Sequence, residues 1–182
     1  EVVHYCGLPM YSTSGCTDTK KMDMQSAMEA SLSINAAMMS GANFVHDNGY
    51  TESGLTGDIF QTVMDDEIIA MARVVEGGVE VNKDTLAVEQ IANVGPGGHY
   101  LYEDHTMEHF RDYWMPTLMD RNSYETWQQE GEKTMKERVQ DKTRDLIKNH
   151  EGPRNKVPEK ANAEIEKILQ EAEKRVKKEG VK

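Results

Sequence analysis

The sequence has 182 residues, 37% of them hydrophobic, a size that suits one ordinary domain or a large piece of a bigger protein. With 32 acidic and 21 basic residues, its formal charge of -11 argues against nucleic acid binding, and no apolar run reaches the roughly 18 residues that span a bilayer. We therefore expect a cytoplasmic protein without nucleic acid or membrane partners. The two cysteines, Cys6 and Cys16, argue against a disulfide scaffold and against a zinc site built on thiolates.

The start of the chain reads as the middle of a structural element. Glu1 is not an initiator methionine, and the stretch "EVVHYCGLPMYSTS" carries no leader-like pattern. We therefore expect the sequence to be the C-terminal part of a longer protein.

The first half of the chain has the pattern of a β-α-β unit. The stretch "GLPMYSTSG" predicts a strand, and residues 23–40, rich in Ala, Met, Leu and Ile, predict a helix that Gly41 ends. The stretch "ANFVHD" then predicts a second strand one helix-length downstream. Two strands joined by a helix pair in parallel, so a β-α-β unit is expected.

Two further helices follow the glycine-rich turn after the second strand. Apolar residues at steps of four and three predict one helical stripe that lies against the strands and ends at Gly77, namely Phe60, Met64, Ile68, Met71 and Val75. The stretch "VNKDTLAVEQI" predicts another helix, for which Asn82 is a suitable N-cap.

The second half of the chain is helical and more polar. Its last helix, from Pro158, carries an apolar stripe in a highly charged sequence and is predicted to dock on the outside of the fold; the stripe comprises Ala161, Ile165, Ile168, Ala172 and Val176. We expect residues 1–98 to form barrel strands and helices and residues 99–182 to form a helical region that packs on them.

Polar residues follow both predicted strands, as in enzymes that keep their functional loops at the C-terminal ends of barrel strands. The predicted fold class is therefore α/β, the C-terminal portion of a TIM (β/α)8 barrel with additional C-terminal helices. A three-layer α/β fold is the alternative.

Three stretches carry a resemblance to a known family: "GANFVHDNGYTESGLTG", "MDDEIIAMARVVEGG" and "VNKDTLAVEQIANVGPGGHYLYEDHTMEHFRDYW". Together they resemble the trimethylamine methyltransferase family, which includes trimethylamine and glycine betaine:corrinoid methyltransferases. The resemblance implies an enzyme that moves a methyl group from a methylated amine to the Co(I) of a separate corrinoid protein. The corrinoid is then carried by the partner, with no cofactor bound tightly by this chain, and a homo-oligomer is left open.

The resemblance places His46 and Asp47 at the barrel mouth, where they would be catalytic. Tyr50 and Glu52 follow on the same loop and are expected to bind substrate, because an aromatic face and a carboxylate can hold a methylated ammonium. The alternative is structural: His46 would hydrogen-bond a neighbouring loop and Asp47 would cap a turn.

The loop after the first strand offers Asp18 and Lys20 as further substrate-binding residues. Alternatively, Asp18 starts the helix and Lys20 pairs with Asp23 on the surface. Some relatives specific for trimethylamine carry pyrrolysine, and Lys20 or Lys21 is a position where a lysine letter could stand for it. If neither does, a quaternary amine such as glycine betaine is favoured as the substrate.

Three histidines, His99, His105 and His109, are spaced by six and four residues, which matches no zinc motif. We expect them to form structural hydrogen bonds and predict no metal site.

Aromatic residues in the second half, Phe110, Tyr113, Trp114 and Trp127, are predicted to anchor the partner surface. The rival function is a catalytically incomplete module that docks a corrinoid protein or binds a small amine.

Overall fold

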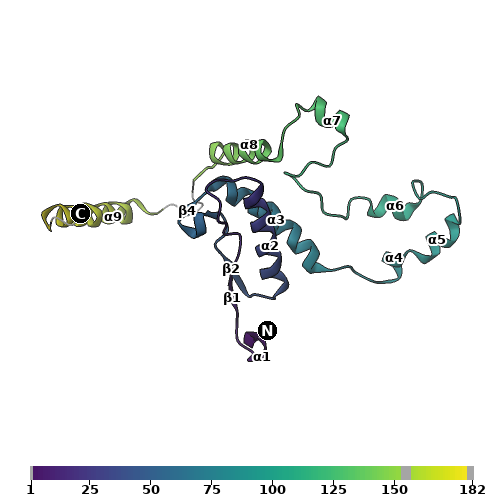
Figure 1. The fold of residues 1–182 in the computed structure, drawn as a ribbon, viewed down its shortest axis with the longest axis horizontal. Coiled ribbons are helices and arrows are strands. Elements are labelled where there is room, and N and C mark those ends of the chain that lie inside the picture. Colours follow the sequence, from purple (N-terminus) through teal and green to yellow (C-terminus); the bar gives the residue numbers. More distant parts are fainter. Residues whose placement is uncertain (1, 153–156, 180–182) are drawn as a thin grey trace. The chain divides into compact units, whose positions relative to one another are not determined.

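The computed structural model describes residues 2–152 and 157–179 (Figure 1). The chain divides into two compact units, residues 1–146 and residues 147–182. The helices described are α1 (Val2–Tyr5), α2 (Met24–Met39), α3 (Ile59–Gly77), α4 (Lys83–Leu86), α5 (Val88–Val94), α6 (Asp104–His109), α7 (Tyr124–Gln129), α8 (Met135–Lys148) and α9 (Glu159–Glu179). The strands described are β1 (Tyr11–Thr13), β2 (Phe44–His46), β3 (Tyr50–Thr51) and β4 (Thr56–Gly57), with a short 3-10 helix at Glu52–Gly54.

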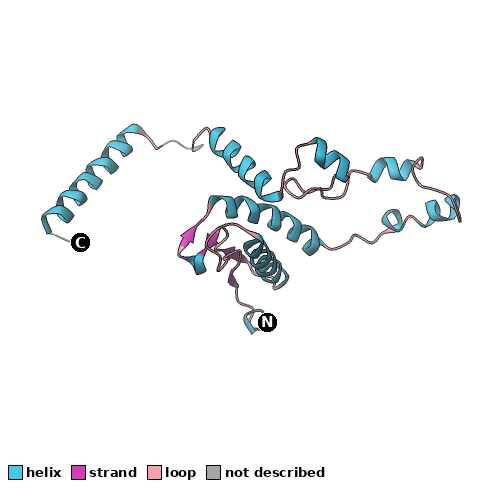
Figure 2. Ribbon diagram, turned by 45° about the horizontal axis from the view of Figure 1, so that its top comes forward, coloured by secondary structure: helices cyan, strands magenta, loops and turns pink. Residues whose placement is uncertain are grey.

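The predicted β-α-β unit is confirmed. Strands β1 and β2 pair in parallel, with Tyr11 opposite Phe44 and Thr13 opposite His46, and α2 connects them (Figure 2). Helix α2 begins after Asp23, whose carboxylate accepts a hydrogen bond from the Ser26 N–H while the Ser26 hydroxyl accepts one from the Asp23 N–H. This capping box satisfies backbone donors that the first helical turn would leave unpaired.

The two faces of the β1–β2 pair differ. Val45 lies on the helix side, where it lines a hollow together with Ile34 of α2 and Ile69 of α3. On the opposite face, Tyr11 and Phe44 are 63% and 58% exposed, and their rings stack with centroids 5.1 Å apart. Side chains alternate between faces along a strand, so one whole face of this sheet is open.

A tight hairpin leads into the second long helix. Strands β3 and β4 pair antiparallel, with Tyr50 opposite Gly57, and the Asp58 carboxylate caps α3 by accepting from the Phe60 and Gln61 N–H groups. Helix α3 therefore has a fixed start directly after the loops that follow β2.

The hydrophobic core lies between α2 and α3 and extends to the second half of the chain. Its buried members are Met22, Ala30, Ile34, Met64, Ile68, Ala72, Leu118 and Val139. Burial of an Ile or Met side chain of this kind stabilises the fold by about 1.5–3 kcal/mol. The sequence predicts that the α3 stripe lies against the strands, whereas the structure places its Met64 and Ile68 in the core shared with α2.

The helix predicted from "VNKDTLAVEQI" is split in two. Asn82 caps α4 as expected, accepting hydrogen bonds from the N–H groups of Asp84 and Thr85. Ala87 then adopts a left-handed conformation with φ of 48°, which ends α4 and starts α5. A residue in the left-handed conformation interrupts a right-handed helix, so the two segments are separate helices.

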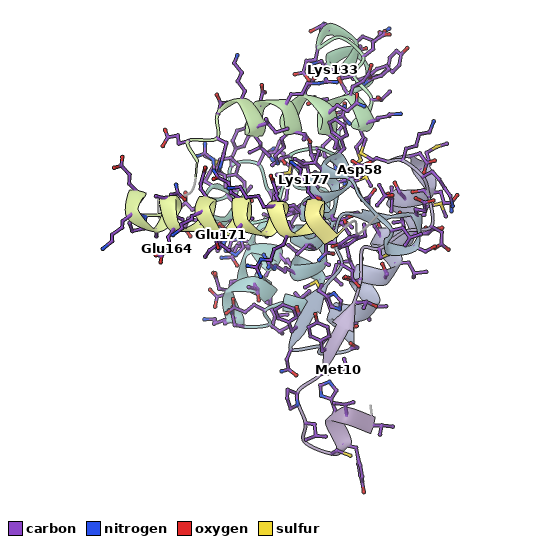
Figure 3. All side chains as sticks on the ribbon, turned by 90° about the vertical axis from the view of Figure 1, so that its left-hand side faces the viewer. Met10, Asp58, Lys133, Glu164, Glu171 and Lys177 are labelled. Carbon is purple, nitrogen blue, oxygen red and sulfur yellow. The ribbon has the colours of Figure 1, made fainter. Side chains whose placement is uncertain are left out.

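Helix α9 is confirmed as a charged helix from residue 159 onward, with Glu164, Glu171 and Lys177 among its side chains (Figure 3). Its apolar stripe includes Ile168, whose side chain is 61% exposed. Whether this stripe docks on the fold stays a prediction.

No closed barrel is formed by residues 2–152 and 157–179, which contain two sheets of two strands each. The α/β class is confirmed at the level of the β-α-β unit. None of the helices within the described ranges combines the length and the apolar character needed to cross a membrane.

Candidate functional site

The His46–Asp47 pair lies at the C-terminal end of β2. The His46 Nδ1 atom is 2.6 Å from the Asp47 carboxylate, and both side chains are about one-third exposed. Asp47 has a φ of 74°, a left-handed conformation that is costly for a non-glycine residue. Strain of this kind persists where the surroundings enforce it and is found often at functional sites.

The loops after β1 and β2 run side by side. The Ser14 N–H donates to the His46 carbonyl (2.9 Å), and the Thr17 N–H donates to the Tyr50 carbonyl (3.0 Å). The Glu52 N–H in turn donates to the Thr19 carbonyl (2.7 Å). The parallel pairing of β1 and β2 thus brings both groups of predicted site residues to one edge of the sheet.

Asp18 and Lys20 belong to this double loop. The Asp18 carboxylate accepts a hydrogen bond from the Ser53 hydroxyl at 2.8 Å, next to Glu52. The Lys20 ammonium donates to the Asp18 carbonyl at 2.8 Å, so it folds back onto its own loop. The N-cap of helix α2 is Asp23 and not Asp18.

The double loop is acidic. Burial raises the pKa of the Cys16 thiol, and the nearby charges of Asp47, Asp18 and Glu29 raise it further. The Cys16 thiol therefore lies near three carboxylates, which come from the loop after β1, from α2 and from the loop after β2. A local cluster of negative charges of this kind attracts a cation.

An aromatic surface adjoins the pair. The Tyr11 ring stacks on the His46 ring with centroids 4.3 Å apart, on the open face of the β1–β2 sheet. Tyr50, the aromatic residue that the sequence suggested, is exposed on the next strand. Aromatic faces attract quaternary and protonated amines through cation–π interaction.

Asp65 supports this edge of the sheet, and sequence reasoning missed it. Its buried carboxylate accepts hydrogen bonds from the Gly49 N–H and the Gln61 amide, each at 2.7 Å. Burial raises its pKa to about 6, although both hydrogen bonds act in the opposite direction. The available signal was a polar pair, Gln61 and Asp65, four residues apart beside the apolar Met64 and Ile68.

Two glycines allow the loops to approach closely. A Cβ atom at Gly15 would lie 2.5 Å from the Asn48 side-chain oxygen and 3.0 Å from its Cα. A Cβ atom at Gly49 would collide with the Thr62 side chain. Both glycines also have positive φ, so no other residue fits without strain.

His99, His105 and His109 lie in two different places. His99 packs edge-on against Tyr102, with ring centroids 5.1 Å apart. His105 and His109 instead lie together on α6, facing Asp84 of α4.

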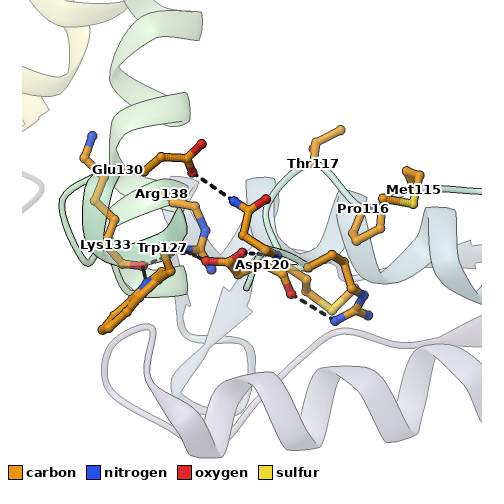
Figure 4. A pocket seen from close by; sticks show the side chains of 11 residues that line it. Met115, Pro116, Thr117, Asp120, Trp127, Glu130, Lys133 and Arg138 are labelled. Carbon is orange, nitrogen blue, oxygen red and sulfur yellow. Dashed lines mark hydrogen bonds and ion pairs between the residues drawn. The ribbon is translucent and has the colours of Figure 1, made fainter. Parts of the chain in front are cut away.

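A separate hollow is lined by 11 residues that lie between Met115 and Arg138 in the chain (Figure 4). Trp127 borders it, and its indole N–H donates to the Lys133 carbonyl at 3.0 Å. Asp120 and Arg138 form an ion pair there at 3.5 Å. Trp127 is therefore half-buried and held by its own segment, while Phe110 and Tyr113 are exposed.

The parallel β-α-β unit, with ionisable residues and strained loops at the C-terminal ends of its strands, is the arrangement found in α/β enzymes. The model of the family described as trimethylamine methyltransferase (MTTB) matches residues 2–178, and the chain belongs to this family.

Three relatives with assigned functions support membership of this family. The trimethylamine methyltransferase MttB of Desulfitobacterium hafniense strain DSM 10664 / DCB-2 is 32% identical over 95% of this chain. The glycine betaine methyltransferase of strain Y51 is 33% identical over 93% of the chain, and the MttB of Methanosarcina barkeri strain Fusaro / DSM 804 is 31% identical over 83%. The chain spans about a third of the length of these relatives (34%, 34% and 30%).

Proposed function

We propose that this chain forms the C-terminal portion of a (β/α)8-barrel methyltransferase that moves a methyl group from a methylated amine to the Co(I) of a corrinoid protein. Residues 1–98 would supply barrel elements, and residues 99–182 would supply a helical region that packs on them. Two relatives, a trimethylamine methyltransferase and a glycine betaine methyltransferase, support this proposal.

The observation that carries the proposal is the position of the His46–Asp47 pair. It ends a parallel strand, it contacts the loop from the neighbouring strand, and His46 lies on the open sheet face beside Tyr11. In a barrel the corresponding face points inward and the strand C-termini form the mouth. The exposed rings of Tyr11 and Phe44 have the size and polarity of residues that a barrel interior would cover.

The proposed methyl transfer depends mainly on how the protein positions the substrate. In the proposed transfer the C–N bond would break with its electron pair left on nitrogen, which departs as a neutral amine, and the Co(I) of the partner protein would supply the electron pair that accepts the methyl group. The carboxylates of Asp18, Asp47 and Glu52 would hold the ammonium group, and the aromatic faces would orient its methyl groups. His46, fixed by Asp47, would set the shape of the mouth toward the cobalt.

A quaternary amine needs no proton before its neutral amine leaves, whereas neutral trimethylamine must be activated. Lys20, whose ammonium is bound to the Asp18 carbonyl, is placed to hold its own loop. The proposal therefore favours a quaternary amine such as glycine betaine, with trimethylamine as the second substrate to assay.

The test is methyl transfer by the protein expressed from its complete reading frame, with its corrinoid protein reduced to Co(I) and either glycine betaine or trimethylamine. His46→Ala and Asp47→Ala should each lower the rate about tenfold to a thousandfold, on the order of 1.4–4 kcal/mol in activation free energy. Asp66→Asn, an exposed change on α3, is the matched control. Unchanged rates in both folded variants would reduce the pair to a structural turn.

A further inference from the structure

A second cluster of chemically competent side chains lies away from the strand ends. Asp84 of α4 faces His105 and His109 of α6: the His109 Nε2 atom is 3.1 Å from one carboxylate oxygen and the His105 Nε2 atom is 3.6 Å from the other. The two imidazole rings are 4.5 Å apart between centroids. One ligand atom from each of the three residues lies within 4.8 Å of the others.

The donor set is suited to a metal ion. Two histidines four residues apart lie on one face of a helix, so α6 presents both rings in the same direction. Two imidazoles and one carboxylate are ligands that Zn²⁺ and neighbouring divalent transition metals prefer, and three protein ligands leave a position for water or a further ligand.

The distances require only a small adjustment. Ligand atoms around a tetrahedral ion with bonds of about 2.0–2.1 Å lie roughly 3.3 Å apart. The present separations therefore need to shorten by at most about 1.5 Å. All three side chains are partly exposed, with 60% for Asp84, 22% for His105 and 38% for His109, and can rotate without disturbing a packed core. His105 would exchange its 3.0 Å contact with the Asp84 carbonyl for the ion.

The surroundings of His109 strengthen the argument. Its Nδ1 atom lies 2.6 Å from the Asp112 carboxylate, which can only accept a hydrogen bond when ionised. Asp112 therefore holds the Nδ1 side of the ring, and Nε2 points at the Asp84 carboxylate from 3.1 Å. On metal binding, Nε2 would exchange its contact with Asp84, and any proton it carries, for the ion. Metal-binding histidines are held in this way by a carboxylate on the opposite nitrogen.

We propose that Asp84, His105 and His109 bind one divalent transition-metal ion, with Zn²⁺ the best match to the donor set. The ion would clamp α4 to α6, with Asp112 as a positioning residue for His109. This assignment departs from the expectation of no metal. The spacing of the histidines concealed the site because the third ligand is Asp84, 21 residues before His105 on another helix. The proposal does not depend on methyl transfer.

The experiment is Zn²⁺ binding, measured by isothermal titration and by equilibrium dialysis with metal analysis, on the protein from its complete reading frame near neutral pH. Wild type should bind one more equivalent of Zn²⁺ than His109→Ala or Asp84→Asn. Asp112→Asn should keep that equivalent but bind it about 10- to 100-fold more weakly. His99→Ala, an exposed histidine outside the cluster, should match wild type.

Equal stoichiometry and affinity in wild type, His109→Ala and Asp84→Asn would overturn the proposal. A second measurement covers variants that fail to fold, as judged by circular dichroism. Co²⁺ added to the wild-type protein should develop the intense visible absorption of a low-coordinate site and lose it when Zn²⁺ is added. A spectrum that stays that of hydrated Co²⁺ would overturn the proposal without any variant.

Discussion

Glu67 and Leu118 are 51 residues apart in the chain, yet the Leu118 N–H donates a 2.7 Å hydrogen bond to the Glu67 carboxylate. Both residues are buried. The same carboxylate accepts from the N–H and hydroxyl of Thr117 and from the Met119 N–H. Burial by itself would raise the pKa of Glu67, but these hydrogen bonds hold its pKa below the ordinary value. One side chain of α3 thereby fixes the segment that places Leu118 in the core.

Glu67→Ala should lower the free energy of unfolding by about 2–4 kcal/mol, because it leaves several backbone donors without an acceptor. The measurement is equilibrium unfolding in urea. Glu67→Gln keeps one acceptor oxygen, so its free energy of unfolding should lie between those of wild type and Glu67→Ala. Asp66→Ala, an exposed change on the same helix, should stay within about 0.5 kcal/mol of wild type. A loss as small in Glu67→Ala as in Asp66→Ala would contradict this role.

Asp65 should make stability depend on pH in the opposite sense from Glu67. Its pKa is raised from 3.8 to about 6 in the folded protein, so its contribution to stability is greatest below pH 3.8 and is lost as the pH rises through 6. Ionisation of the buried Asp65 carboxyl therefore lowers the free energy of unfolding by about 3 kcal/mol once the pH is well above 6. Asp65→Asn removes this penalty. Once the Gln61 amide turns over, the new amide can donate to the Gln61 side-chain oxygen, which is buried and has no hydrogen-bond partner within residues 2–152 and 157–179.

We therefore expect Asp65→Asn to be more stable than wild type near pH 8, with the difference shrinking toward zero near pH 4. Urea unfolding across this pH range gives the free energy of unfolding of wild type and of Asp65→Asn as a function of pH, and Asp66→Asn is the exposed control. A difference that is constant with pH would show that the carboxylate does not titrate as described.

Gly49→Ala should distort the loop that carries Tyr50 and Asp47. Gly49 has a φ of 87°, and a Cβ atom there would collide with Thr62. We expect a loss of about 1–3 kcal/mol in stability and a fall in methyl transfer larger than the stability loss explains. Gly77→Ala, where a Cβ atom meets open space, is the control. Normal activity in a stable Gly49→Ala protein would separate the loop shape from function.

Trp114→Ala should weaken binding of the corrinoid protein without unfolding the chain, if the aromatic residues after His99 form the partner surface. Trp114 is half-buried and Phe110 and Tyr113 are exposed. Binding of the purified corrinoid protein, followed by surface plasmon resonance alongside circular dichroism, distinguishes the outcomes. Loss of the folded state would assign Trp114 to the core instead.

Local elements and the parallel direction of the β-α-β unit could be predicted from the amino-acid sequence. Helix ends followed from capping residues such as Asn82, and the strand that ends at His46 followed from a short apolar run between glycines. These features depend on residues close together in the chain, so composition and spacing are sufficient to predict them. The family resemblance was likewise carried by short quoted stretches and was confirmed over residues 2–178.

Contacts between residues far apart in the chain became visible in the folded structure and had no signal in the sequence. The folded structure joined Asp65 to Gly49, Glu67 to Leu118 and Asp84 to the histidines of α6. It also placed Met64 and Ile68 of α3 in a core shared with α2. Such contacts depend on how elements fold back on one another, and the free energies that select them are spread over many residues with no local pattern.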